Sequence, residues 1–61
     1  MDRKELEEKY GEVWDTSEAT EEFTFRGFSA PFAVVTRKST GEEGAIRFQD
    51  RPRFYFDFTP V

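Results

Sequence analysis

Apolar residues near the start of the chain recur at a helical spacing. They fall at positions i, i+4, i+7 and i+8 of one stripe: Leu6, Tyr10, Val13 and Trp14. Asp2 is a favourable N-cap, and Glu5 three residues later completes a capping-box pattern. Gly11 interrupts the stripe, and glycine commonly ends helices. The pattern predicts a helix over residues 2–10, after which Val13 and Trp14 lie in a turn that still packs inward.

The next segment, residues 15–22, is polar throughout. Thr16 or Ser17 can cap one short helical turn there, because hydroxyl side chains accept hydrogen bonds from the first free amides of a helix. A loop fits the same residues equally well, so the sequence leaves both alternatives open.

From residue 23 onwards, apolar positions alternate with a period of two, which is typical of strands. Turn residues separate four strand-like runs: 23–28, 45–49 and 53–58 alternate in this way, and 31–38 is rich in β-branched residues. The short connections favour an antiparallel meander. We therefore predict a single α+β domain over residues 1–61, in which one N-terminal helix packs on a four-stranded antiparallel sheet. A small bent β-barrel is the alternative, because Gly27 and Gly44 can mark bends.

Turn chemistry predicts how these strands pair. A three-residue hairpin loop over residues 39–41, with Gly41 in the left-handed conformation, places Val34 opposite Ile46. A second three-residue loop over residues 50–52 places Phe56 opposite the same Ile46. The predicted core face of the sheet, covered by the helix, is then Phe23, Phe25, Phe32, Val34, Ile46, Phe48, Phe54, Phe56 and Phe58. A slip of one residue would turn each of these side chains to the other face.

Strand alternation assigns the arginines of the sheet to the opposite, uncovered face. The candidate binding residues are Arg26, Arg37, Arg47, Arg53 and Tyr55, around a small apolar centre of Ala33, Val35 and Ala45. Tyrosine and arginine are enriched at binding hot spots, and the guanidinium fork suits bidentate recognition. The structural alternative is that Arg47 opposite Tyr55, and Arg37 opposite Glu43, only keep the sheet soluble through cation–π and ion pairs.

The composition narrows the chemistry that the chain can perform. Its 61 residues include no cysteine and no histidine, which excludes disulfides, thiol nucleophiles and the commonest general base. Most carboxylates lie on the solvent face of the predicted helix or in the polar segment after it. They lack the fixed separation and contrasting environments of paired catalytic acids. We therefore predict a protein that is not an enzyme and holds no cofactor and no metal.

Charge is distributed unevenly along the chain. The net charge is −4, but residues 1–22 carry nine acids and three bases, whereas residues 23–61 carry four acids and six bases. The overall sign argues against general affinity for nucleic acid, and the asymmetry permits a local basic surface. The first ten residues contain no apolar run, and no stretch approaches the length of a membrane span. These features predict a cytoplasmic protein without membrane contact.

Three functions fit these features. The leading hypothesis is protein–protein interaction, including self-association as a homodimer, through the outer sheet face or the edge of the last strand. That strand, residues 53–58, is long, aromatic and free of proline, and natural proteins avoid leaving such an edge bare. The alternative is single-stranded nucleic-acid binding by the arginine and tyrosine face. A third hypothesis is that the acidic residues 1–22 mimic a polyanion.

Several short motifs of the chain resemble those of a group of short phage and bacterial proteins. In that group a Trp-Asp-Thr segment precedes an APF-VV-RK strand, a Ser-Asp-Gly-type turn and a terminal PRFYF strand. The likeness covers residues 14–58 and matches at Trp14, Asp15, Thr16, Gly27, Phe28, Ala30, Pro31, Phe32, Arg37, Lys38, Gly41, Phe48, Gln49, Pro52, Arg53, Phe54, Tyr55 and Phe56. It departs at Thr40, where the group has aspartate. The resemblance implies no assigned activity, only a small accessory protein of phage type.

Overall fold

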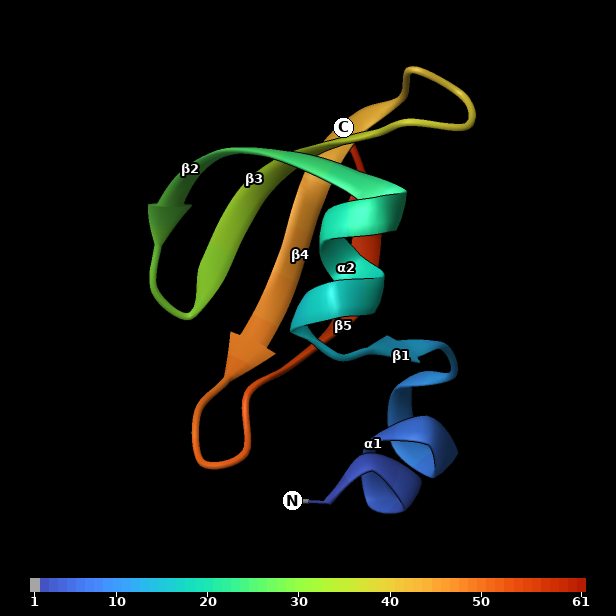
Figure 1. The fold of residues 1–61 in the computed structure, drawn as a ribbon, viewed down its shortest axis with the longest axis vertical. Coiled ribbons are helices and arrows are strands. Elements are labelled where there is room, and N and C mark those ends of the chain that lie inside the picture. The colour runs from blue at the N-terminus through green and yellow to red at the C-terminus, as the bar shows by residue number, and fades with distance from the viewer. Residues whose placement is uncertain (1) are drawn as a thin grey trace.

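A computed structural model describes residues 2–61. Within them the chain forms two short helices and five strands: α1 (Arg3–Tyr10), β1 (Val13–Trp14), α2 (Thr16–Glu22), β2 (Phe23–Ser29), β3 (Phe32–Arg37), β4 (Glu43–Gln49) and β5 (Phe54–Pro60). The strands make one open antiparallel sheet in the order β1-β5-β4-β3-β2 (Figure 1). The α+β class and the meander of the last four strands are confirmed. The single helix, the four-stranded sheet and the barrel alternative are not, because the structure adds α2 and the edge strand β1 and leaves the sheet open.

The first helix begins and ends as its sequence predicts. The Asp2 carboxylate accepts a hydrogen bond from the Glu5 backbone amide at 2.9 Å, and the Glu5 side chain accepts one from the Asp2 amide. These reciprocal bonds satisfy two amides that have no partner inside the helix. Gly11 follows with a φ of +87°, a conformation that glycine adopts without strain. The capping box and the glycine stop of α1 are therefore confirmed.

The segment after the first helix differs from the prediction. Val13 and Trp14 do not lie in a turn but form β1, which pairs with Phe56 and Tyr55 of the last strand. Residues 16–22 are helical, and Asp15 caps them instead of Thr16 or Ser17. The Glu18 amide donates to Asp15 Oδ1 at 2.8 Å, and Glu18 Oε1 accepts from the Asp15 amide at 3.0 Å. A second capping box therefore settles the open choice between loop and helix.

Both hairpin registers differ from the predicted ones by one residue. Ala33 pairs with Ile46, and Phe48 pairs with Tyr55, so each loop contains four residues instead of three. In the β3–β4 loop the Gly41 amide donates to the Arg37 carbonyl at 2.7 Å, and Gly41 has the predicted left-handed conformation, with φ +72°. The extra residue in each loop shifts the facing positions by one. As a result, Ala33 and Val35 point into a core, whereas Phe32 and Val34 are exposed.

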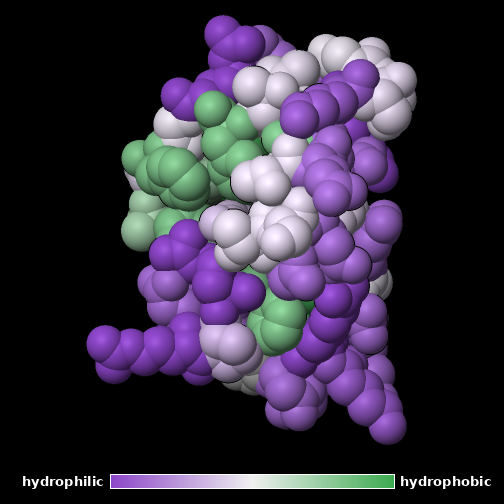
Figure 2. Space-filling view, in the orientation of Figure 1, coloured by the Kyte–Doolittle hydropathy of each residue, from purple (hydrophilic) through white to green (hydrophobic). Residues whose placement is uncertain are grey.

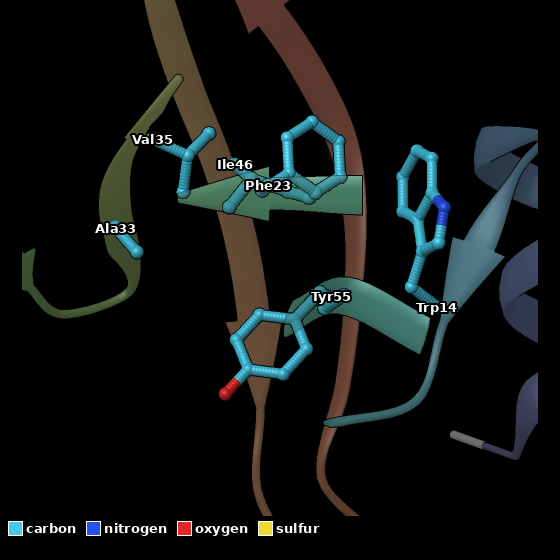
Figure 3. Packing of buried hydrophobic residues seen from close by; sticks show 7 residues of the cluster. Trp14, Phe23, Ala33, Val35, Ile46 and Tyr55 are labelled. Atoms are coloured by element: carbon cyan, nitrogen blue, oxygen red, sulfur yellow. The ribbon is translucent and has the colours of Figure 1, made fainter. Parts of the chain in front are cut away.

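Hydrophobic clusters lie on both faces of the sheet. The first cluster is covered by α2, and its members come from this helix and all five strands: Trp14, Ala19, Phe23, Ala33, Val35, Ile46 and Tyr55 (Figure 3). The second joins Leu6 of α1 to Val13 and Phe56, with Tyr10 and Phe54 at its margin. We call these sides the α2 face and the α1 face. The predicted single core under one helix is therefore wrong, because each helix covers part of a different face.

A bulge in β5 distributes its aromatic rings between the two faces. Phe56 pairs with Arg47, but Thr59 pairs with Ala45, so β5 has one residue more than β4 between these pairs. Asp57 lies in this bulge with a φ of +57°. Strict alternation would keep Phe56 and Phe58 on one face. Instead Phe58 packs against Phe23 of the α2-face cluster, with ring centroids 5.1 Å apart.

No helix within residues 2–61 is long and apolar enough to cross a bilayer.

Candidate binding surface

The five predicted binding residues do not share one open face. Tyr55 is only 4% exposed and belongs to the α2-face cluster, so the expectation that it stands on an uncovered surface is wrong. The physical reason is the one-residue change of register, which pairs Tyr55 with Phe48 and turns its ring inward. The hydroxyl of Tyr55 accepts a hydrogen bond from Arg53 Nη1 at 3.0 Å.

Arg37 and Arg53 are held by carboxylates of the chain itself. Arg37 Nε donates to Glu22 Oε2 at 2.6 Å, and Arg53 Nε donates to Asp50 Oδ1. These hydrogen bonds raise the pKa of both guanidinium groups above their ordinary value. Arg37 ties the end of α2 to the sheet, and Arg53 fixes the β4–β5 loop. Ion pairs within the chain therefore occupy both residues, but the pairs that the structural alternative named are wrong: Arg37 pairs with Glu22 instead of Glu43, and Arg47 lies over Tyr10 instead of Tyr55.

Arg26 lies at an edge of the sheet. It is the extra residue of a bulge in β2, between the pairs that Phe25 and Gly27 make with β3, and it is exposed. The edge of the last strand, which the sequence predicts to be free, is covered in part, because β1 pairs with β5 at Tyr55 and Phe56. The long free edge belongs to β2. A bulge with a charged residue is a common way to prevent such an edge from pairing with another strand.

Arg47 is the arginine whose environment fits a binding role. Its guanidinium lies over the rings of Tyr10, Phe56 and Phe32, at 5.4, 5.7 and 6.0 Å from their centroids. Arg47 Nη1 donates to the Tyr10 hydroxyl at 3.3 Å, but Nε is buried without a hydrogen-bond partner. No carboxylate within residues 2–61 forms an ion pair with it. The surrounding rings orient the guanidinium, and most of its donors have no acceptor within residues 2–61.

An apolar groove begins beside Arg47 on the α1 face. We call it the α1-face groove; it encloses about 510 Å³ and is lined by Phe32, Val34, Glu43, Gly44, Ala45, Thr59, Pro60 and Val61. Phe32 pairs with Arg47, and Val34 pairs with Ala45, so side chains of β3 and β4 lie next to one another across the groove. Phe32 is 44% exposed and Val34 is 48% exposed. The sequence pattern did not reveal this groove, because it assigned both residues to the core.

A second apolar area lies on the α2 face, beyond the end of α2. The ring of Phe28 is 60% exposed and stacks on Phe25, and its edge meets the ring of Phe48. Figure 2 shows hydrophobic residues gathered over the side of this face that holds β2 and β3. The Arg53 guanidinium lies 4.7 Å from the centroid of Phe48. Here the arginine already has a carboxylate partner, unlike Arg47.

Acidic side chains dominate the surface between the two helices. A cleft there is lined by Glu7, Glu12, Glu18, Glu21 and Glu22, with Arg3, Val13 and Trp14. Arg3 bridges the helices, because its guanidinium lies 2.8 Å from Glu18 and 3.5 Å from Glu7. Within residues 2–61 no group of three or more acidic side chains is arranged to hold a metal ion. Arg37 pairs with two further carboxylates of the cleft, Glu22 at 2.6 Å and Glu12 at 3.9 Å, so this acidic side is held together by two arginines.

We expect the stability of α2 to depend on the charge of Glu18. The Asp15 amide, and then Arg3, hold the pKa of Glu18 below its ordinary value of 4.5. A lowered folded-state pKa stabilises the fold above the unfolded value, and this stabilisation is lost as the pH falls through the folded value. Glu18→Gln, which keeps the capping geometry, should therefore melt lower than the wild type above the ordinary carboxyl pKa, and the difference should shrink as the pH falls through and below that value. Thermal melts by circular dichroism measure the difference, which should be small because the group is exposed. An unchanged difference across this range would contradict the role of the charge.

The structure defines the class of the protein, that of small α+β proteins with an open antiparallel sheet. No protein-family model, curated protein or solved structure matches the chain.

Proposed function

We propose that this chain is a non-enzymatic binding module that holds a protein partner in the α1-face groove. The observation that carries the proposal is the exposure of Phe32 and Val34 on β3, a strand in the interior of the sheet. Neighbouring strands add Ala45 and Thr59, so the apolar side chains form one continuous surface. Contiguous exposed apolar surface with a polar rim is typical of an interaction site.

Arg47 defines the chemistry of the partner. A half-buried guanidinium without a counterion is unfavourable, and its free donors suit a carboxylate. A partner that fits the groove has apolar side chains opposite Phe32 and Val34 and a carboxylate opposite Arg47. Arginine held on aromatic rings loses little conformational freedom when it binds such a group. Of the five residues that the sequence singles out, Arg47 is therefore the one that we assign to the binding site.

Single-stranded nucleic acid is the second candidate for the same surface. The exposed ring of Phe32 beside the Arg47 guanidinium is a combination on which bases stack. The net charge of −4 counts against it, since backbone phosphates require a basic surface. Mimicry of a polyanion by the acidic side between the helices is the third candidate. A cytoplasmic location and an accessory role of phage type stay predictions.

Val34→Arg tests the groove directly. We expect this variant to fold normally, because exposed substitutions usually change stability by about 0.5 kcal/mol or less. A charged side chain in the middle of the groove should lower capture of a protein partner from host extract at least about tenfold, equivalent to roughly 1.4 kcal/mol. The matched control is Thr24→Arg, an exposed position on the same face outside the groove. Quantitative mass spectrometry of the captured proteins compares both variants with the wild type.

Each outcome discriminates between the candidates. Equal capture by Val34→Arg and the wild type would reject the groove as the binding surface. If capture is lost only when Glu7, Glu12 and Glu21 are neutralised, the function belongs to the acidic side. Binding of a single-stranded oligonucleotide that falls steeply with salt would favour nucleic acid, because apolar association depends little on salt.

A further inference from the structure

We infer that the partner in the α1-face groove is a second copy of this chain, in a two-fold dimer that pairs Arg47 of each copy with Glu43 of the other. The inference rests on the proposed function, since it names the occupant of the same groove. It requires that the groove of one copy supply a carboxylate to Arg47 of the other copy. The same groove must also supply the apolar surface that covers Phe32 and Val34 of the other copy.

The α1 face carries both halves of this pairing, with Glu43 in the lining of the groove and Arg47 beside it. Glu43, Ala45 and Arg47 alternate along β4 on the α1 face, so an acid and a base lie on either side of a small central residue. At about 3.3 Å per residue, Glu43 and Arg47 are roughly 13 Å apart, too far for an ion pair within one chain. Glu43 is exposed and, within residues 2–61, forms no ion pair either.

A two-fold axis makes these charges complementary. An axis parallel to the sheet, crossing the strands at the level of Ala45, lays β4 of one copy antiparallel over β4 of the other. Ala45 then faces Ala45, Val34 faces Val34, and each Arg47 faces a Glu43. Two sheets pack in this way about 10 Å apart, with apolar side chains between them. Such an interface is isologous, the commonest arrangement of soluble oligomers.

The size of the groove determines how strongly we expect two copies to associate. A standard interface buries roughly 800 Å² per partner, which is about a fifth of the 3996 Å² of surface that the chain exposes. The groove occupies only part of one sheet face, so the dimer should be weak and in rapid exchange. Sedimentation velocity should therefore extend from about 10 µM to about 1 mM protein, a range that covers weak specific association.

Charge reversal provides the decisive test. Glu43→Arg places two arginines opposite each other, and Arg47→Glu places two glutamates opposite each other, so each variant alone should remain a monomer at concentrations where the wild type dimerises. An equimolar mixture of the two should dimerise again, because each glutamate then faces an arginine. The matched control is Glu42→Arg, the same charge change at the adjacent exposed turn residue, which should dimerise like the wild type.

The outcomes separate this inference from the proposed function. A wild type that stays monomeric at about 1 mM, or a Glu43→Arg variant that dimerises as well as the wild type, would overturn the dimer. If Val34→Arg nevertheless loses a captured protein, the groove still binds a partner and only its identity is wrong. Should Arg47→Glu fail to fold, Glu43→Arg compared with Glu42→Arg still decides, because both of these positions are exposed.

Discussion

Replacement of Leu6 by aspartate is expected to unfold the protein at room temperature. Leu6 is 0% exposed and packs against Val13 and Phe56 on the α1 face. An unpaired charge in such a site costs about 3–5 kcal/mol, and the lost leucine packing adds to it. The whole reserve of a 61-residue domain is roughly 3–9 kcal/mol at 0.05–0.15 kcal/mol per residue. The circular-dichroism spectrum and thermal melt of the Leu6→Asp variant measure the effect.

The control for this variant is Lys4→Asp, which places the same carboxylate on the exposed side of α1. It should melt close to the wild type, because surface substitutions usually change stability by about 0.5 kcal/mol or less. A Leu6→Asp protein that melts within a few degrees of the wild type would show that α1 is not part of the cooperative fold.

Gly44→Ala is expected to lower the melting temperature by about 5–20 °C. A Cβ atom at Gly44 would lie 2.5 Å from the Thr59 carbonyl oxygen and 2.7 Å from the ring of Phe58. The oxygen belongs to the paired backbone of β5, so relief of the contact must move a strand and not only a side chain. Overpacking of this kind costs about 1–3 kcal/mol, and 1 kcal/mol corresponds to about 4–8 °C in a domain of this size.

Gly27→Ala is the matched control, since it adds the same methyl group in another strand. Apart from Gly27 and its two chain neighbours, no atom of residues 2–61 lies within 4 Å of the position that its Cβ would occupy, and the φ of Gly27 is not positive. We expect its melting temperature to equal or slightly exceed that of the wild type, because alanine restricts the unfolded chain. Equal losses in both variants would show that glycine matters at these positions for a reason other than space.

The parts of the fold that local chemistry determines could be predicted. The capping box of Asp2 and Glu5 and the stop at Gly11 depend only on residues close in sequence, and the structure confirms them. The strands of the meander follow in the same way, β2, β4 and β5 from their alternating pattern and β3 from its β-branched residues. The second capping box, Asp15 with Glu18, has the same spacing as the first and was visible in the sequence. Aspartate caps a helix as well as a hydroxyl residue does, so the spacing of Asp15 and Glu18 favours a helix over a loop.

The register could not be predicted, because β3 carries apolar side chains on both of its faces. Phe32 and Val34 on one side compete with Ala33 and Val35 on the other, and size favours burying the phenylalanine. The structure buries the smaller pair, which fits under α2 beside Ile46. Loop length decides between these arrangements, and three- and four-residue loops are both common in hairpins. The sequence did not indicate the groove for the same reason. It did indicate Arg47, because in β4 the side chains lie on the faces that the alternation predicts.

The bulge at Asp57 makes the two clusters depend on one another during folding. The bulge places Phe56 on the α1 face and Phe58 on the α2 face, so both clusters pack against side chains of β5. The first strand, β1, also pairs only with β5, so α1 and β1 have no sheet to dock on until the far end of the meander is in place. Contacts between segments so distant in sequence form late, since closing the long loop between them costs entropy first. We therefore expect the N-terminal layer to form late in folding, and a polypeptide that has not yet reached residue 56 to leave Leu6 and Val13 uncovered.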